Sequence, residues 1–567
     1  MRGWDAFLKF AVLWIGLLLV TGGLILKTRI GKIEFSSLDP WVLGFAVLLG
    51  IRLWISDRPT ALASWWKKGF AACTRTEGQS RRLLGVFALV FGALALAHLF
   101  RHLGFETAIY DHACIHQPLW NAFSNPLLKC DTCVGGSYLG EHLSFVFFLV
   151  ALVVKALGFL LMPLQGPNLS VFLLQAFLTG WMLWLLVRKG PLEKKPELWI
   201  FAAIILLCFR GVRASVVWDF REDLIAGCGF AIALVSYGKQ RWWLYSLGLA
   251  IAVLSKENMG LVIAVLGISI ALDRSRVRVG IATIALGLAA TVIAFKFLIP
   301  HFSAGAESEN NIVRRFPGLG TTTAQVLMGL VTNPGTAAGL FLPKIFSFGA
   351  FKYLVLLLGP VLAFGCRSFL GWLPALSLIA MNLLSDAPTQ RSLQFHYELA
   401  MTPFLAFAVL EGMARTPMSA IRGRLGIVAL LLALGTSGRW PGAMLSRYFP
   451  TAQDTRASFC LSRVPDLGIT MSSVATLPQI SHLRSVRHFQ WPADAGDRSG
   501  KQLWNDQFES LPNTRARFSK EDFSKIQAIV LDLEQPLEKK LSDDRERIDF
   551  HEVFACGENR FRILKRD

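Results

Sequence analysis

Residues 216–272 read VVWDFREDLIAGCGFAIALVSYGKQRWWLYSLGLAIAVLSKENMGLVIAVLGISIAL and decide the class of fold. The stretch contains three apolar runs, at 224–237, 242–255 and 258–272, separated by short connections that hold acidic and basic residues. An apolar run that approaches the roughly 30 Å thickness of a bilayer core predicts a membrane-spanning helix, although the shorter runs leave their ends approximate. The stretch therefore predicts an α-helical integral membrane protein.

The composition of the whole chain agrees with this prediction. Of 567 residues, 53% are hydrophobic and 17% charged, whereas a soluble chain of this size carries about 25% charge. Lys and Arg number 58 against 39 Asp and Glu, a net charge of +19, and these charges lie between the apolar runs. That distribution is typical of basic cytoplasmic loops beside anionic lipid, so membrane lipid is the expected partner and nucleic acid is not.

The positions of the positive charges predict which loops are cytoplasmic. Further apolar runs occur at 10–26, 41–55, 83–100, 169–187, 198–209, 279–298, 352–366, 369–384, 399–414 and 425–437. Clustered Lys and Arg make the connections 57–82, 188–195, 239–241, 274–278 and 415–424 cytoplasmic. This assignment requires that 143–162 lies in the membrane plane or re-enters; a true span there would invert every later loop. The resulting prediction is thirteen spans, with the N-terminus inside and the C-terminus outside.

The predicted architecture has three parts. Residues 1–82 contain two additional helices and a basic cytoplasmic linker, 83–437 form the main membrane domain with an outer loop at 101–168, and 438–567 form an extracytoplasmic soluble domain. In the last part, the runs LGITMSS (467–473), IQAIVLDL (526–533) and RFRILKR (560–566) are strand-like, and KEDFSKI (520–526) is helical. This part is predicted to be an α/β domain. Asp532 ends one strand-like run, where a turn residue is commoner than a ligand.

Acidic and basic residues accumulate in the connections that are predicted to be outside. Any single one of them is explained as well by a helix cap or an interfacial anchor, but their number suggests a polar cavity that opens outward. A carboxylate there could act as a general base while Arg and Lys hold a phosphate, or the cluster could carry ions through a transporter. The residues are Tyr110, Asp111, His112, Glu141, His142, Asp219, Arg221, Glu222, Asp223, Lys256, Glu257, Asp386, Arg391, His396, Tyr397 and Glu398.

The cysteines suggest disulfides rather than a metal site. Cys130 and Cys133 form a lone CxxC, for which a local disulfide or idle thiols are more common than a redox or metal role. Cys460 and Cys556 flank the soluble domain and are predicted to pair in an oxidising space. The chain has no phosphate-loop, HExxH or GxSxG motif in a suitable context.

Four ordered blocks resemble a known membrane-protein family. They are IYDHACIHQPLWNAF (109–123), GSYLGEHLSF (136–145), the stretch 216–264 quoted above, and MNLLSDAPTQRSLQFHYELAMTPFLAFAVLEGMAR (381–415). They resemble the signature blocks of the family catalogued as domain of unknown function two-zero-seven-nine, over about residues 83–567. That family is similar to C-type glycosyltransferases (GT-C), which take a sugar from a polyprenyl-phosphate carrier and place an acidic residue in the first outer loop.

The resemblance implies a set of site residues. Asp111 would be the catalytic base, Glu141 and His142 would line the same cavity, and Arg221, Lys256 and Arg391 would bind the carrier phosphate. Glu222, Asp223, Glu257, His396 and Tyr397 complete the expected substrate-binding set. The family block usually reads D-x-G-x-x-D-Q, whereas this chain has Asp111, Ala113, His116 and Gln117. Because the second acid is absent, dependence on a divalent metal ion stays open, and no other cofactor is expected.

The function expected from the sequence is transfer of a sugar from a polyprenyl-phosphate donor to a glycan, lipid or protein acceptor on the outer face of a bacterial inner membrane. The alternative is a transporter or flippase of a lipid-linked or small polar substrate. A transporter should have a polar track to the cytoplasmic side, whereas the apolar runs here are nearly free of acidic residues. The sequence does not specify the sugar, the acceptor or the oligomeric state.

Overall fold

The computed structural model describes a set of ranges that covers most of the membrane part and the centre of the C-terminal domain. These are residues 24–28, 31–35, 68–71, 74, 76–107, 112–131, 133, 136–161, 166–303, 313, 315–320, 323–365, 368–393, 395–437, 444–445, 447–467, 470–473, 486–489, 527–533, 539, 550–556 and 560–566. The predicted span 41–55 and the predicted helix 520–526 lie outside them.

Two strands near the N-terminus correct one prediction. β1 (Leu24–Thr28) and β2 (Gly31–Phe35) pair antiparallel, with Thr28 opposite Gly31. The helical prediction for 10–26 is therefore wrong at its last three residues, and the rest of that run lies outside the described residues. In β2, Ile33 and Phe35 alternate with polar residues, which favours a strand over a helix.

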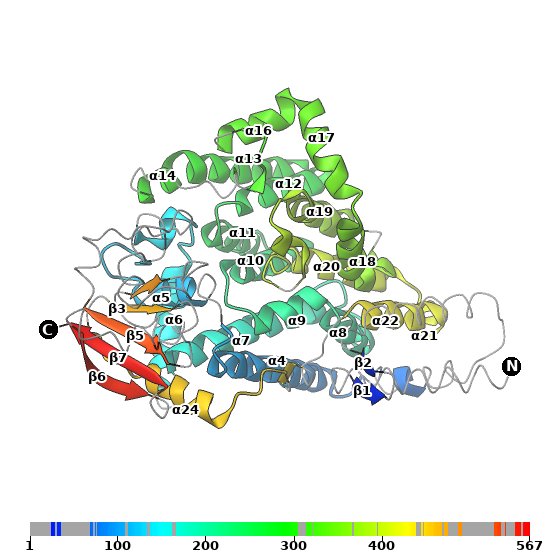
Figure 1. Cartoon of the computed structure of the whole chain (residues 1–567). Coiled ribbons are helices and arrows are strands. Elements are labelled where there is room, and N and C mark those ends of the chain that lie inside the picture. The colour runs from blue at the N-terminus through cyan, green and yellow to red at the C-terminus, as the bar shows by residue number, and fades with distance from the viewer. Residues whose placement is uncertain are drawn as a thin grey trace.

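The membrane part is helical, and most predicted runs coincide with helices (Figure 1). The first of these helices are α4 (Gln79–Leu103), α5 (Cys114–Trp120), α6 (Phe147–Leu160), α7 (Gly166–Lys189), α8 (Trp199–Leu207), α9 (Arg210–Val217) and α10 (Glu222–Gly238). They are followed by α11 (Trp242–Ser255), α12 (Met259–Ala271), α13 (Val277–Ile293), α14 (Ile299–Phe302), α16 (Thr323–Thr332), α17 (Pro334–Ile345), α18 (Phe348–Leu362), α19 (Phe369–Leu384), α20 (Thr402–Arg415), α21 (Met418–Arg422) and α22 (Arg424–Thr436). The sequence did not predict α16 or α17.

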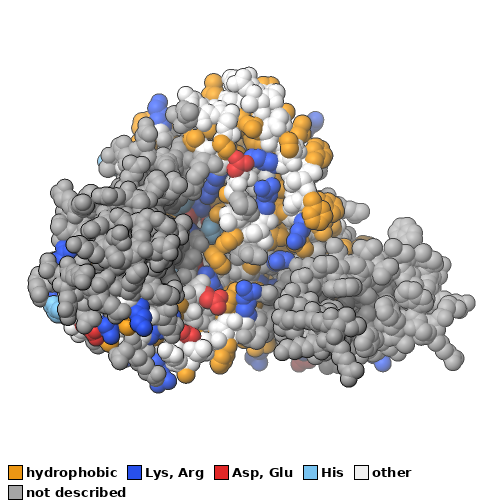
Figure 2. All heavy atoms as spheres, in the orientation of Figure 1, with side chains coloured by type: hydrophobic (Ala, Val, Ile, Leu, Met, Phe, Trp, Pro, Cys, Tyr) orange, Lys and Arg blue, Asp and Glu red, His pale blue; other side chains and the backbone are white. Residues whose placement is uncertain are grey.

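Within the described residues, three helices are long and apolar enough to cross a membrane: Gln79–Leu103, Asn168–Lys189 and Arg274–Phe302. The count rises to five if two helix pairs, bent by 65° and 66°, each form one span. The thirteen spans stay a prediction. Hydrophobic side chains are spread over the described surface in Figure 2, as expected for a chain that contacts lipid.

Helices α4 and α7 run antiparallel, which fixes the course of the chain between them. His98 and His102, near the end of α4, contact Phe172, near the start of α7, with ring centroids 3.9 and 5.4 Å apart. The connection therefore leaves and returns at the same end of the pair. Its main helix, α6, has 14 residues, about 21 Å at 1.5 Å per residue, which is shorter than a bilayer core of about 30 Å.

The basic connections meet at the opposite end of the bundle. The contacts there join Lys239 to Glu193 (Nζ to Oε2, 2.8 Å), the Arg276 guanidinium to the Tyr237 ring (4.5 Å), and Lys195 Nζ to the Ala414 carbonyl oxygen (2.6 Å). In Figure 1, α21 and α22 lie toward this end and the C-terminal sheet lies at the other. Four of the five connections predicted to be cytoplasmic, 188–195, 239–241, 274–278 and 415–424, thus share one end, and the side of the membrane stays a prediction.

The C-terminal part is an α/β domain, as predicted. Its elements are α24 (Ala452–Leu461), β3 (Thr470–Ser473), β4 (Val486–Phe489), β5 (Ala528–Asp532), β6 (Phe550–Cys556) and β7 (Phe561–Arg566). The sheet has the order β4-β3-β5-β7-β6, in which β3 pairs parallel with β4 and β5, and β7 pairs antiparallel with β5 and β6. All five residues of β5 are buried, which explains its continuous apolar sequence.

The C-terminal domain packs against the outer loop of the membrane part. Phe105, just after α4, stacks on Phe561 of β7 with ring centroids 5.1 Å apart, and Ala113 is buried in the same apolar cluster. Arg560 lies over the Phe105 ring at 5.0 Å and pairs with Asp532 at 3.1 Å. Asp532 is therefore held in a structural ion pair at the end of β5.

Candidate functional site

Lys256, which lies between α11 and α12, is at the centre of a group of buried polar residues. This group, called the outer polar cluster below, consists of His142, Glu222, Asp223, Lys256, Glu257 and His396. Lys256 Nζ is 2.8 Å from Glu222 Oε1 and 2.7 Å from Asp223 Oδ2, and all three side chains are nearly buried. Burial by itself would lower the pKa of Lys256, but the carboxylates of Asp223 and Glu222 outweigh it and raise that pKa above its usual value. The Lys256 ammonium thus donates a hydrogen bond to Asp223 and forms an ion pair with Glu222.

Close packing of α10 and α11 brings these residues together. The two helices run antiparallel through a short turn at 239–241, so the start of α10 and the end of α11 share one end. Gly229 and Gly248 face each other, and a Cβ on Gly248 would lie 2.6 Å from the Gly229 carbonyl oxygen. Only glycine at these positions permits this approach of the two backbones.

The outer loop reaches the same cluster through η3 (Tyr138–Gly140) and the residues after it. The Tyr138 hydroxyl donates to Glu222 Oε2 at 2.9 Å, and His142 Nδ1 lies 3.1 Å from Glu257 Oε1. Burial raises the pKa of Glu257, but His142 and Lys256 lower it more, so the net direction is down. The loop therefore contacts two of the cluster's carboxylates.

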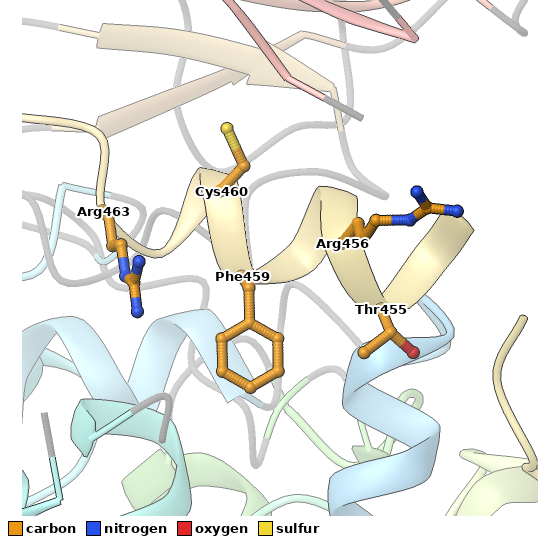
Figure 3. A pocket seen from close by; sticks show the side chains of 5 residues that line it. All are labelled: Thr455, Arg456, Phe459, Cys460 and Arg463. Atoms are coloured by element: carbon orange, nitrogen blue, oxygen red, sulfur yellow. The ribbon is translucent and has the colours of Figure 1, made fainter. Parts of the chain in front are cut away.

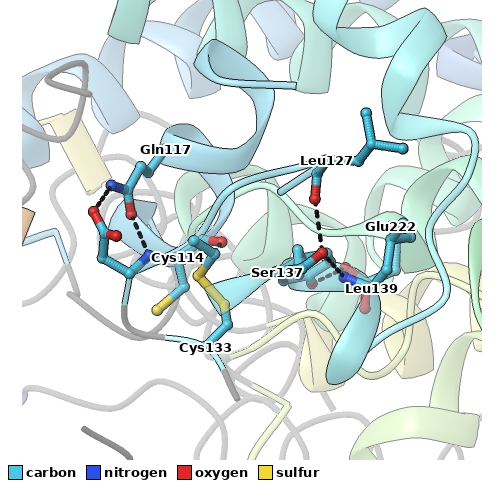
Figure 4. Close-up of a disulfide and its surroundings, with 10 residues drawn as sticks. Cys114, Gln117, Leu127, Cys133, Ser137, Leu139 and Glu222 are labelled. Carbon is cyan, nitrogen blue, oxygen red and sulfur yellow. Dashed lines mark hydrogen bonds between the residues drawn. A yellow bond between two sulfur atoms is a disulfide. The ribbon is translucent and has the colours of Figure 1, made fainter. Parts of the chain in front are cut away.

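Local bonds hold the loop in this shape (Figure 4). A disulfide joins Cys130 to Cys133, Gln117 Nε2 donates to Asp131 Oδ2 at 2.7 Å, and the Ser137 hydroxyl donates to the Leu127 carbonyl oxygen at 2.7 Å. The CxxC motif is thus a local disulfide, one of the two interpretations that the sequence favours over a redox or metal role.

The segment before α20 adds His396, Tyr397 and Glu398. His396 Nε2 is 3.9 Å from Asp223 Oδ2, and burial is the main cause that lowers the pKa of His396. The Tyr397 ring faces the guanidinium of Arg315 at 6.0 Å. Glu398 is 2% exposed. Three segments far apart in the sequence, around 140, 222–257 and 396, therefore converge.

A second buried group lies at the outer end of α4. Arg101 Nη1 is 3.0 Å and His98 Nε2 3.4 Å from Asp219 Oδ1, and the Arg101 guanidinium covers the Trp218 ring at 4.0 Å. Burial raises the pKa of Asp219, yet Arg101 and His98 lower it more, so the carboxyl is ionised. This ion pair joins α4 to the connection between α9 and α10.

Histidine rings continue from this group toward the predicted base. The His112 and His102 ring centroids are 5.1 Å apart, and His112 Nε2 is 2.9 Å from Asn168 Oδ1. Asp111, which directly precedes His112, lies outside the described residues, as does Tyr110.

The structure brings together six of the predicted site residues: His142, Glu222, Asp223, Lys256, Glu257 and His396. Arg221 is buried beside them and acts electrostatically on Tyr138 and His396. Glu141 is half-buried at the end of η3, and Arg391 is half-buried at the end of η9 (Pro388–Arg391).

The sequence analysis did not select His98, Arg101 or Tyr138, and it named Glu398 among the polar residues of the outer connections without giving it a role in the site. For His98 and Arg101 a signal was present, because ionisable side chains inside an apolar span are costly and usually functional. Tyr138 had no such signal, since its partner Glu222 is distant in the sequence. Among the described residues, no group of three or more His, Cys, Asp or Glu side chains is arranged to hold a metal ion.

Cys460 and Cys556 form a disulfide, which confirms the predicted pairing and links α24 to β6. A cavity of about 410 Å³ lies on α24, lined by Thr455, Arg456, Phe459, Cys460 and Arg463. Figure 3 shows Phe459 and Cys460 pointing to opposite sides of this helix. None of its lining residues belongs to the outer polar cluster.

These features define a helical membrane protein with a polar cluster at one end of its bundle and a small α/β domain at that same end. Residues 101–441 match the family described as predicted membrane protein (DUF2079), and the chain belongs to this family. No curated protein matches the sequence.

Two solved structures are similar in outline. ArnT from Cupriavidus metallidurans bound to undecaprenyl phosphate is 13% identical with a TM-score of 0.47, over 84% of this chain and 97% of that chain. The apo state of the same protein is 13% identical with a TM-score of 0.46, over 85% and 98%. A structural similarity of this extent does not indicate the activity of this chain.

Proposed function

We propose that this protein is a membrane glycosyltransferase that moves a sugar from a polyprenyl-phosphate-linked donor to an acceptor hydroxyl on the extracytoplasmic face. The observation that carries the proposal is the convergence of buried carboxylates, Lys256, Arg221 and two histidines at one end of the bundle. The signature blocks resemble those of the DUF2079 family, and the similarity of that family to C-type glycosyltransferases supports the same reaction class.

Asp111 is the proposed general base. It removes the proton from the acceptor hydroxyl as that oxygen attacks the anomeric carbon, and the bond from this carbon to the phosphate oxygen breaks. The polyprenyl phosphate leaves with the bonding electrons, and its charge is offset by the Arg221 guanidinium and the Lys256 ammonium. His112, the next residue in the chain, is buried and bonded to Asn168, which supports a fixed position for this part of the loop.

The proposed orientation puts the cluster and the C-terminal domain outside a bacterial inner membrane, with α6 in the membrane plane. Two disulfides support it, because the outer loop and the C-terminal domain each contain one, and disulfides persist in oxidising compartments. The basic connections at the other end of the bundle support a cytoplasmic position for that end.

The test is an Asp111→Asn variant in cells, with the donor lipid and the glycosylated product measured together. We expect the donor to accumulate and the product to fall by about 10²-fold or more, as when a positioned general base is removed. The matched control is Glu106→Gln, which removes an exposed carboxylate from the same loop and should leave both levels unchanged.

Normal donor and product levels in Asp111→Asn would refute the base assignment. Donor lipid that collects only on the cytoplasmic side of vesicles would instead identify a flippase, the alternative function. In that case inverted and right-side-out vesicles would differ in donor exposure, whereas a transferase leaves the sidedness of the donor unaffected.

A further inference from the structure

Glu398 is a buried carboxyl group that the outer cluster leaves without a partner. It is 2% exposed, and within the described part of the chain no other residue hydrogen-bonds to either of its carboxyl oxygens. Its neighbour His396 contacts Asp223, and Asp223 acts electrostatically on Glu398. Glu398 therefore borders the cluster without joining its ion pairs.

The fold makes space for this side chain. A Cβ on Gly211 of α9 would lie 2.8 Å from Glu398 Cβ and 2.9 Å from Cγ, so only glycine there leaves room for the glutamate. The Thr402 hydroxyl donates to the Glu398 carbonyl oxygen at 2.8 Å and fixes the backbone at the start of α20. The position is thus built for a carboxyl side chain, although none of the other described residues bonds to its oxygens.

The surroundings of Glu398 disfavour its charge. The groups that act on it are Arg210 on α9, Asp223 on α10 and Tyr353 on α18, with His396 in its own segment. Burial, with a smaller contribution from the Asp223 carboxylate, raises the pKa of Glu398 to about 8, against the opposite effects of a hydrogen bond from its own backbone N–H and of Arg210. At neutral pH the group is mostly a carboxylic acid, with one O–H donor and one C=O acceptor.

We infer that Glu398 is a binding residue for a hydroxylated, uncharged moiety, whose hydroxyl groups form the hydrogen bonds that the buried carboxyl oxygens of Glu398 leave open. This inference rests on the proposed function and names the part of the donor that this residue contacts, the sugar. An ionised carboxylate would repel the phosphate of such a donor, whereas a neutral acid bonds the sugar at no electrostatic cost. The unfilled hydrogen-bonding capacity is then completed by the ligand.

The first arm of the test measures the protonation state without a ligand. Infrared difference spectra of the purified full-length protein, taken between pH 5 and 10, should contain the C=O stretch of a protonated carboxyl group that disappears with a midpoint near pH 8. The Glu398→Gln variant should lack this band. Glu411→Gln, a control on the following helix α20 that removes a carboxylate partner of Arg415, should keep it. Persistence of the band in Glu398→Gln would overturn the inference.

The second arm measures binding of a polyprenyl-phosphate-linked sugar and of the same polyprenyl phosphate without sugar. Wild-type affinity for the sugar-linked lipid should fall about 10-fold from pH 7 to pH 9, because one pH unit above the pKa leaves about a tenth of the group protonated. Glu398→Gln keeps a donor and an acceptor, so it should bind as tightly as wild type at pH 7 without the decline. Glu398→Met has neither and should bind the sugar-linked lipid at least about 10-fold more weakly at both pH values.

The outcomes separate the two hypotheses. If the wild type binds neither lipid, the proposed function fails and this role fails with it. If the wild type binds but Glu398→Gln shows the same decline with pH, or Glu398→Met loses affinity equally for both lipids, only the inference about Glu398 is refuted. A circular dichroism melt of each variant verifies folding.

Discussion

Replacing Lys256 with methionine should destabilise the folded protein more than the same replacement of any other lysine in a described ion pair. The ammonium lies 2.8 Å from Glu222 Oε1 and 2.7 Å from Asp223 Oδ2. Methionine keeps most of the side-chain volume but removes the charge. Two adjacent buried carboxylates would then face each other without the cation between them.

The expected magnitude follows from these distances. At an effective dielectric constant of about 20, each contact is worth roughly 6 kcal/mol of Coulomb attraction, most of which offsets the desolvation of the three groups. Removing one member of a buried pair usually costs about 3–5 kcal/mol, because the remaining charge stays buried. We therefore expect Lys256→Met to lower the free energy of unfolding by about 3–5 kcal/mol at pH 7.

The assay is unfolding in mixed micelles by titration with dodecyl sulfate, followed by tryptophan fluorescence. Adding Glu222→Gln to Lys256→Met removes one orphaned charge and should restore about 1–3 kcal/mol. The control is Lys239→Met, whose partner Glu193 is 2.8 Å away but whose pair is half-exposed, 26% and 38%. Such a pair contributes about 0–1 kcal/mol.

The dependence on pH checks the mechanism. Without Lys256, the pKa of a buried carboxyl group that has lost its cation is higher in the folded protein than in the unfolded chain. At pH values between these two pKa values, the folded state therefore binds more protons than the unfolded state. The penalty in Lys256→Met should therefore grow as the pH rises from 5 to 8. A loss below about 1 kcal/mol, equal to that of Lys239→Met, or a penalty that does not change with pH would refute this account of the cluster.

Two further predictions concern packing and covalent structure. Gly248→Ala should destabilise the α10–α11 pair by about 1–3 kcal/mol, because its Cβ would lie 2.6 Å from the Gly229 carbonyl oxygen, whereas Gly238→Ala, with nothing within 4 Å of the added Cβ, should be neutral in the same unfolding assay. Cys460→Ser with Cys556→Ser opens a disulfide with a sequence separation of 96 and should cost about 4–5 kcal/mol by chain entropy. Cys130→Ser with Cys133→Ser, at a separation of 3, should cost about 2 kcal/mol, and equal losses for the two pairs would contradict the entropic origin.

Helices were predictable wherever a long apolar run decides the local structure. The predicted bounds of α11 (242–255) and α19 (369–384) agree with the structure, because polar or turn residues end both runs. The first predicted span was wrong at Leu24–Leu26, since strand pairing with β2 outweighs the apolar composition there. The bent pair of α17 and α18 was missed in its first half, because α17 contains Gly, Pro and Thr among its apolar residues.

The candidate site was predictable as a set of residues but not as a set of contacts. Charged residues next to apolar helix indicated His142, Glu222, Asp223, Lys256 and His396, because a charge at that boundary is costly unless it is paired. The sequence contains no sign of which charges pair, however. Nor does it indicate that Glu398, which belongs to the same motif as His396, has no partner for its oxygens.

By itself, the sequence determined the class of this protein, since hydropathy and the distribution of Lys and Arg act locally and need no knowledge of the fold. It also determined the family, the α/β character of the C-terminal part and the pairing of Cys460 with Cys556. Only the tertiary structure decided that Lys256 is held by Glu222 and Asp223, and that Phe105 packs on Phe561. The physical reason is that ion pairing and burial depend on distances between segments far apart in the chain, and packing of the helices and the sheet sets those distances.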